Sequence, residues 1–216
     1  MPEQPADAKR GSPLRRGVFG GAFNPPHLGH LICAQEARWQ LGLERVTMMP
    51  MGHAPHREIE PEPGADVRVE LCRLAAAGSD WLEVSELETR RDGPSYTAET
   101  LAQLHEAEPD DELTLILGAD QAAHLASWHE PERVLELARV AVAAREGMER
   151  EAVLRRLDRV GRDGVIEFFD MPRVDISSTM VRERLAEGRP VGYLVPEAVA
   201  GVVEERGLYT AGVGTA

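Results

Sequence analysis

Short apolar runs alternate with longer amphipathic segments along the whole of this 216-residue chain. A run of a few apolar residues bounded by turn residues indicates a buried strand, whereas apolar positions that recur every three or four residues indicate a helix. We therefore expect strands at 17–19, 45–51, 81–84, 112–117, 140–144 and 165–169. Helices are expected at 27–41, 66–77 (capped by Asp66), 96–107, 119–126, 131–138, 148–160, 178–187 and 196–206.

Strands that alternate with helices over the full length predict a parallel sheet covered by helices on both faces. The chain shows no internal repeat, low-complexity tract or linker between halves. We expect one α/β domain with a doubly wound sheet over residues 17–210, preceded by a disordered polar tail over residues 1–16. Ligands of such folds bind at the carboxyl ends of the strands, where the strand order reverses. The loops after Phe19, Met51, Leu117 and Phe169 are therefore the expected place for a site.

The charge and the lysine content exclude several classes of mechanism and partner. The formal net charge is −13, and Lys9 in the polar tail is the only lysine of the sequence. This excludes a Walker A loop, a protein-kinase lysine and a Schiff-base lysine. Phosphate groups would have to be bound by arginine, histidine, backbone N–H groups or a metal. The acidic balance also argues against a nucleic-acid partner, which normally requires a basic face.

The cysteines and the apolar runs indicate the cellular compartment of the protein. Cys33 and Cys72 stand alone, without the spacing of metal ligands, as in reduced intracellular proteins. The polar tail lacks the apolar core of a signal peptide. No run approaches the ~18 apolar residues of a membrane span. We expect a cytoplasmic protein without a membrane partner.

The segment 20–30, which reads GGAFNPPHLGH, follows the first expected strand. Gly20 and Gly21 let the backbone approach a ligand and expose N–H groups. A helix that starts near His27 directs its positive end toward the same space. Because His27 and His30 are three residues apart, they share a helix face. The string predicts an anion site in which two imidazoles donate to phosphate oxygens, and it disfavours a plain glycine turn with two exposed histidines.

A second His-x-x-His pair, His53 and His56, is followed by Arg57. Two such pairs would allow a zinc site, but structural zinc sites usually include thiolates, and this pair lies in a proline-broken loop. A loop whose Arg57 or His56 reaches a phosphate is the favoured interpretation, and a plain surface loop is the alternative.

The segment 175–182, DISSTMVR, follows the last expected strand. Its serines and Thr179 can cap the helix that begins there and present hydroxyls to an anion. Arg182 lies one turn later and can reach a phosphate with two donors at once. A capped helix with a surface arginine is equally compatible with this string.

Three further positions complete the candidates. Asp120 follows the strand at 112–117, where a carboxylate can hold ribose hydroxyls or cap a helix. Tyr96 and Thr97 supply hydroxyls, and Trp128 supplies a large aromatic surface. A core or groove position is the commoner one for such a tryptophan.

These strings match a known family. GGAFNPPHLGH resembles the phosphate-binding signature of the nucleotidyltransferase superfamily, and ISSTMVR resembles its second signature. SYTAETL, LILGADQ and VGYLVPEAVAGVVEERGLY are similar to strings of bacterial nicotinate-nucleotide adenylyltransferases. The resemblance implies a single Rossmann-like nucleotidyltransferase domain over 17–210. It also implies direct transfer of AMP from ATP to nicotinate mononucleotide, which gives nicotinate adenine dinucleotide and pyrophosphate in NAD biosynthesis.

The resemblance also implies roles for the residues that match its motifs. The catalytic residues would be His27, His30 and Arg182. The ATP-binding residues would be Gly20, Gly21, Ala22, Phe23, Asp120, Ser178 and Thr179, and the mononucleotide-binding residues would be Asn24, Arg57, Tyr96, Thr97, Trp128 and Arg145. Mg²⁺ or another divalent cation would be carried with ATP, without a metal ligand from the protein.

The sequence departs from the family pattern at a few positions. Asn24 stands where aspartate is common, Ala22 where threonine or serine is common, and Arg57 where lysine is frequent. None of these changes removes a phosphate-binding histidine. Nicotinamide mononucleotide or phosphopantetheine as the acceptor, and a nucleotide sensor without catalysis, are the alternatives. The sequence leaves the oligomeric state and the metal preference open.

Overall fold

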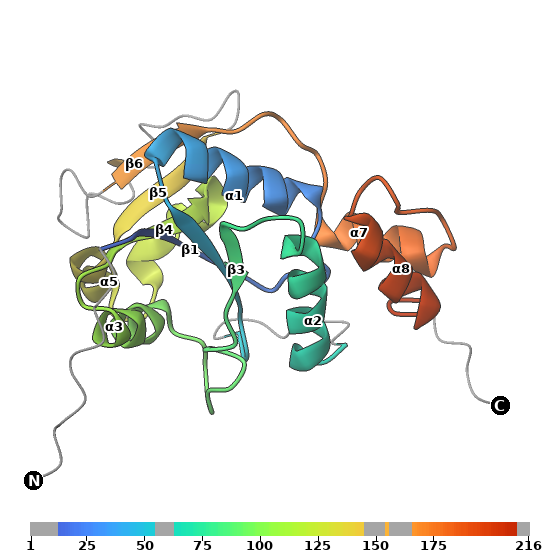
Figure 1. Ribbon diagram of the computed structural model, residues 1–216, viewed down its shortest axis with the longest axis horizontal. Coiled ribbons are helices and arrows are strands. Elements are labelled where there is room, and N and C mark those ends of the chain that lie inside the picture. The colour runs from blue at the N-terminus through green and yellow to red at the C-terminus, as the bar shows by residue number, and fades with distance from the viewer. Residues whose placement is uncertain (1–12, 55–62, 145–153, 156–165, 211–216) are drawn as a thin grey trace, which may run out of the picture.

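A computed structural model of the protein describes residues 13–54, 63–144, 154–155 and 166–210. Within them, six parallel strands form one sheet in the order β3-β2-β1-β4-β5-β6 (Figure 1). The strands are β1 (Arg15–Gly21), β2 (Arg45–Pro50), β3 (Leu82–Val84), β4 (Glu112–Gly118), β5 (Arg139–Ala144) and β6 (Ile166–Asp170). This is the order of a doubly wound sheet, which reverses direction between β1 and β4. The predicted Rossmann-like fold is confirmed.

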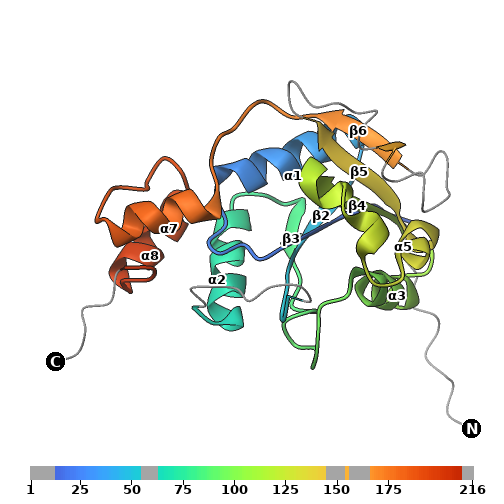
Figure 2. The same ribbon diagram turned by 180° about the vertical axis from the view of Figure 1, so that it is seen from behind.

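Helices cover both faces of the sheet (Figures 1 and 2). They are α1 (Leu28–Leu41), α2 (Ala65–Ala76), α3 (Thr97–Ala107), α4 (Ala119–Ala122), η1 (Leu125–Ser127, a 3₁₀ turn), α5 (Pro131–Leu137), α7 (Ser178–Ala186) and α8 (Glu197–Glu205). Helices α1 and α2 pack on one face, and α3, α4 and α5 pack on the other. No helix in the described part of the chain is long and apolar enough to cross a membrane.

Three sequence predictions change in detail. The predicted helix 119–126 is interrupted, because the His124 N–H bonds the carbonyl of Gln121 in a 3₁₀ turn, and α4 is followed by η1. Asp66 was wrong as the cap of α2: the N-cap is Gly64, and Asp66 lies in the first turn, near the positive end of the helix. The first strand begins at Arg15, two residues before the prediction. The predicted helix 148–160 lies outside the described residues except for 154–155.

The core has two layers because the sheet is covered on both faces. Along β4, Leu113, Leu115 and Leu117 pack against α3, α4 and α5, whereas Ile116 packs against α1. A strand buried on both faces carries apolar residues at consecutive positions, which explains the continuous Leu-Ile-Leu run of β4.

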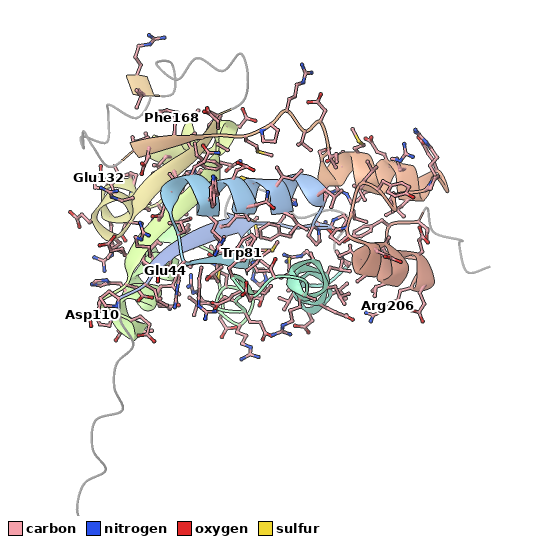
Figure 3. The ribbon with its side chains drawn as sticks, turned by 45° about the horizontal axis from the view of Figure 1, so that its top comes forward. Glu44, Trp81, Asp110, Glu132, Phe168 and Arg206 are labelled. Carbon is pink, nitrogen blue, oxygen red and sulfur yellow. The ribbon has the colours of Figure 1, made fainter. Side chains whose placement is uncertain are left out.

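A third apolar cluster joins α7 and α8 to α2 at one end of the molecule. The chain after β6 passes along α1 to reach α7, and α8 then lies beside α2 (Figures 1 and 2). Arg206 follows α8 (Figure 3). It donates to both carboxylate oxygens of Glu70 on α2 at 2.7 and 2.6 Å. This unit places the start of α7 next to the loop after β1.

Candidate active site

The loop that leaves β1 at the point of strand-order reversal carries the first signature. Gly20 is exposed, and a Cβ at this position would meet no atom within 4 Å, so a ligand can approach the backbone there. The next residues turn inward. Phe23 has a positive φ of 47° and is buried, with its ring edge-on to Phe19 at 5.5 Å and to His30 at 5.0 Å. Phe23 therefore supports His30 from the core, and only its backbone can line the site.

His27 and His30 lie together at the start of α1. Their rings stack with centroids 3.7 Å apart, and His27 is buried as the N-cap residue. The backbone N–H of His27 donates to Nδ1 of His30 at 3.1 Å. Because Nδ1 accepts this bond, the proton of the neutral ring lies on Nε2. The structure thus leaves His30 one donor, Nε2–H, for a ligand.

The surroundings keep His30 neutral. Removal from water, followed in importance by the neighbouring His27 imidazole, lowers the pKa of His30 well below that of a free imidazole. At neutral pH, His30 is therefore a neutral hydrogen-bond donor whose orientation is fixed before any ligand arrives.

Gly29 leaves room for the His27 ring, a role that the sequence analysis did not predict. A Cβ at Gly29 would lie 3.0 Å from two atoms of the His27 ring, which is closer than ordinary contact. The absence of a side chain thus gives the His27 ring its place against the helix. The signal was present, since Gly29 lies inside the HLGH string.

The start of α7 is bound directly to this loop. Ser177 caps the helix by accepting from the N–H of Met180, as the serine-rich string predicted. Ser178 donates through Oγ to the carbonyl of Pro25 at 2.9 Å, and Arg182 donates through Nη1 to the carbonyl of Asn24 at 2.7 Å. The structure brings together the two signatures, which lie more than 150 positions apart in the chain.

Arg182 and Thr179 also contact each other, since Nη2 of Arg182 donates to the Thr179 hydroxyl at 3.3 Å. The Arg182 side chain is only partly buried, whereas Thr179 is exposed. Both residues therefore lie at the edge of the loop after β1 with surface open to a ligand.

Asn24 is almost fully buried in the same loop. Its Oδ1 accepts a hydrogen bond of 2.6 Å from the hydroxyl of Tyr209, a residue that follows α8. Sequence reasoning missed Tyr209 as a site residue, although the resemblance ended there. The C-terminal part of the described chain thus fixes the amide of Asn24.

The segment before α3 holds the predicted acceptor-binding pair. Tyr96 is the N-cap residue of α3, and Thr97 is its first residue. The ring of Tyr96 contacts that of His129, with centroids 4.2 Å apart. His129 is not among the site residues that the sequence predicts. Trp128, its neighbour, is half-buried and packs against the core cluster below α3, α4 and α5.

A buried carboxyl group, Glu88, lies against the first turns of α3. The Thr100 hydroxyl donates to its Oε1 at 2.7 Å, and Ser95 also hydrogen-bonds to it. Burial raises the pKa of Glu88, while the bonds to Thr100 and Ser95 and the charge of Arg91 act in the opposite direction. Ser95 additionally accepts from the N–H of Gly52 at 2.9 Å, so this cluster joins the loop after β2 to the start of α3.

The remaining predicted residues are placed less centrally or lie outside the described part. Asp120 is exposed in the first turn of α4, at the carboxyl end of β4. His53 is exposed in the loop after β2, whereas Arg57, His56 and Arg145 lie outside the described residues. Within the residues that are described, no three His, Cys, Asp or Glu side chains group as metal ligands would.

Comparison with known proteins assigns the family. The Cytidylyltransferase-like family model matches residues 18–184. The chain is 39% identical, over 91% of its length and 96% of the relative's, to the "Probable nicotinate-nucleotide adenylyltransferase" of Desulfitobacterium hafniense. It is 37% identical, over 89% of its length and 97% of the relative's, to the nicotinate-nucleotide adenylyltransferase of Bacillus subtilis. Its fold is similar to that of Plasmodium falciparum nicotinic acid mononucleotide adenylyltransferase complexed with NaAD, with a TM-score of 0.74, 15% identity, and coverage of 91% of this chain and 97% of that one. The chain therefore belongs to the nicotinate-nucleotide adenylyltransferase family of cytidylyltransferase-like proteins.

Proposed function

We propose that this protein transfers the adenylyl group of ATP to nicotinate mononucleotide, which gives nicotinate adenine dinucleotide and pyrophosphate in NAD biosynthesis. Family membership supports this proposal. The observation that carries it is the convergence of both signatures on one loop, where His27 and His30 stack and Arg182 donates to the carbonyl of Asn24. In this proposal, imidazole, guanidinium, hydroxyl and backbone donors would face the phosphates together at the strand-order reversal.

The reaction needs alignment more than proton removal. The nucleophile is a phosphate oxygen of the mononucleotide, which is largely ionised at neutral pH because the second pKa of a phosphate monoester is ~6. This oxygen bonds to the α-phosphorus of ATP, and the bond from that phosphorus to pyrophosphate breaks, without a covalent enzyme intermediate. Fixed donors that stabilise the charge on the reacting phosphates supply the catalysis, and alignment contributes ~7–11 kcal/mol.

The residues of the two signatures have distinct parts in this proposal. His30 donates through Nε2–H to a phosphate oxygen, and His27 acts beside it. Arg182 stabilises the leaving pyrophosphate as the third catalytic residue. The other ATP contacts come from Gly20, Gly21, Ala22 and Phe23 through the backbone, from Ser178 and Thr179 through hydroxyls and N–H groups, and from Asp120 toward a ribose.

The acceptor lies on the side of the loop after β2 and the start of α3. Tyr96 and Thr97 would surround the nicotinate carboxylate, and Trp128 would stack on the ring. The remaining contacts would come from Asn24, Arg57 and Arg145. His129 joins this set because its ring lies against Tyr96.

Mg²⁺ enters this proposal with ATP. The described donors around the loop after β1 are imidazoles, hydroxyls, a guanidinium and backbone N–H groups, which suit phosphate oxygens rather than a hard cation. Phosphate oxygens and water would therefore be the ligands of Mg²⁺, which would neutralise part of the phosphate charge. The cytoplasm is the proposed location, in keeping with two free, buried cysteines.

A pyrophosphate-release assay tests the proposal. Purified protein with Mg²⁺ and ATP is offered nicotinate mononucleotide, nicotinamide mononucleotide, phosphopantetheine or no acceptor. We expect the highest kcat/KM with nicotinate mononucleotide and formation of the dinucleotide by chromatography. A higher value with another acceptor would reassign the substrate, and ATP binding without pyrophosphate release with any acceptor would favour the sensor.

A further inference from the structure

Arg68 on α2 is the largest fully buried side chain of the described residues, although arginine is rarely buried. Its guanidinium donates through Nη1 to the carbonyls of Ala22, at 3.0 Å, and Met51, at 2.8 Å. Nη2 lies 3.4 Å from the carbonyl of Gly52. One side chain therefore holds both the loop after β1 and the loop after β2.

These contacts fix the direction of the neighbouring N–H groups. In a planar trans peptide, the carbonyl of one residue and the N–H of the next point in opposite directions. Since the Met51 carbonyl faces Arg68, the Gly52 N–H must face away, and it donates to the Ser95 hydroxyl at 2.9 Å. By the same geometry, the Phe23 N–H points away from Arg68 and α2.

The two loops also bind each other and the segment before α3. The N–H of Met51 donates to the carbonyl of Gly21 at 3.0 Å, and the N–H of Ser95 donates to the carbonyl of His53 at 2.8 Å. The Ser95 hydroxyl is in turn held by Glu88. A continuous set of hydrogen bonds thus runs from Arg68 through the loop after β2 to the residue that precedes Tyr96.

We propose that Arg68 is a positioning residue for adenylyl transfer, acting through peptide orientation in both loops and touching neither substrate. It directs the Phe23 N–H toward the ATP phosphates and, through Gly52 and Ser95, sets the start of α3 for the mononucleotide. This inference rests on the proposed function. The geometry requires a guanidinium, because its planar fork donates to several carbonyls in fixed directions, whereas an ammonium is a single point of charge.

The test compares substitutions on the same helix. Arg68→Lys keeps the charge, Arg68→Met removes it, and Arg73→Met is the matched control because Arg73 is exposed on α2 and pairs with Glu86. Folded protein, verified by circular dichroism, is assayed for pyrophosphate release below the melting temperature of every variant. We expect Arg68→Lys to lower kcat/KM by about 100-fold, the loss that a misplacement of ~1 Å can cause, with KM raised for both substrates. Arg73→Met should have the kcat/KM and KM values of the wild type.

Wild-type kcat and KM in folded Arg68→Lys would overturn the proposal, and so would a loss of activity that only follows the folded fraction. If neither Arg68 variant folds, Ser95→Ala decides, since it removes the hydroxyl that receives the Gly52 N–H and leaves Arg68 intact. We then expect KM for the mononucleotide to rise about tenfold, as for one lost hydrogen bond, with KM for ATP unchanged. An unchanged KM for the mononucleotide would overturn the proposal.

A failure of the proposed function can be distinguished from a failure of this inference. If the wild type releases no pyrophosphate with any acceptor, the function is wrong, and Arg68 is then judged by calorimetric binding of a non-hydrolysable ATP analogue. Weaker binding to Arg68→Lys than to Arg73→Met would support the positioning role, and equal binding would exclude it.

Discussion

Replacing Gly52 or Gly20 by alanine should have opposite effects: the first should lower stability, and the second should lower activity. A Cβ added at Gly52 would lie 2.4 Å from the carbonyl oxygen of Glu88, about 1 Å closer than a C–H···O contact of about 3.3–3.6 Å. The same Cβ would lie 3.2 Å from the carbonyl carbon of Glu88 and 3.3 Å from Cα of Thr89. All three atoms belong to backbone, so no side chain can rotate to make room. Gly52→Ala must therefore push the loop after β2 away from the segment at 88–89.

The cost of this displacement follows from known overpacking effects. Inserting one methyl group into a packed site costs about 1–3 kcal/mol, and replacing glycine by alanine returns about 0.4–1 kcal/mol by restricting the unfolded chain. The midpoints of these two ranges give a net loss of about 1.3 kcal/mol, and because 1 kcal/mol shifts Tm by about 2–4 °C in a chain of this size, Tm should fall by about 3–5 °C.

Gly20→Ala is the matched comparison. A Cβ there meets no atom within 4 Å, so the free energy of unfolding should change by less than about 0.5 kcal/mol. The new methyl group would occupy the space through which ATP phosphates approach the backbone, so kcat/KM for ATP should fall at least about tenfold, as for a lost hydrogen bond. Urea unfolding and scanning calorimetry measure stability, and pyrophosphate release measures activity. The packing argument would be refuted if Gly52→Ala had the Tm of the wild type, or if Gly20→Ala had a lowered Tm and wild-type kinetics.

Three further predictions concern single side chains. Because the pKa of His30 is lowered in the folded state, the unfolded chain binds the proton first as pH falls below about 6.5. The free energy of unfolding of the wild type should therefore decline with falling pH more steeply than that of His30→Gln, by at most ~1.4 kcal/mol per pH unit. Parallel plots of urea midpoint against pH for the two proteins would contradict this. Tyr209→Phe removes the donor to the buried Asn24 amide and should cost about 1–3 kcal/mol of stability in calorimetry, whereas an unchanged Tm would show that this bond contributes nothing. Trp128→Ala should raise KM for the mononucleotide and leave KM for ATP unchanged in steady-state assays, and equal losses for both substrates would exclude stacking.

The sequence predicted those parts of the fold that depend on local pattern. The buried run of β4 and the alternation of strands with helices follow from burial on both faces of a parallel sheet, which leaves a direct trace in hydropathy. Helix boundaries, which backbone hydrogen bonding sets, were predicted less accurately. Asp66 is an acceptable N-cap residue by type, yet the helix begins earlier, because the N–H of Arg68 bonds the carbonyl of Gly64.

The parts of the site that sequence reasoning missed are contacts between distant segments. Tyr209 meets Asn24 across 185 positions, and Arg68 reaches Ala22 across 46. A tyrosine near a terminus and an arginine inside an amphipathic helix look like ordinary surface residues, and nothing in their local sequence indicates burial. Only packing decides which polar side chain meets which buried carbonyl. Gly29 differs, since its requirement is local: the ring of His27, two residues earlier in the chain, already limits the space for a side chain there.

The close contact of the two histidines also explains why this site is built without lysine. At ring centroids 3.7 Å apart, two positive charges would repel each other by about 4.5 kcal/mol at an effective dielectric constant of 20. Imidazoles avoid this cost because one ring can remain neutral and still donate through an N–H, as the lowered pKa of His30 indicates. An ammonium group is a compact point charge in its usual protonated form, so two lysine ammonium groups at this distance would repel each other. The close pair at the start of α1 therefore favours imidazole over ammonium groups, whatever the net charge of the rest of the chain.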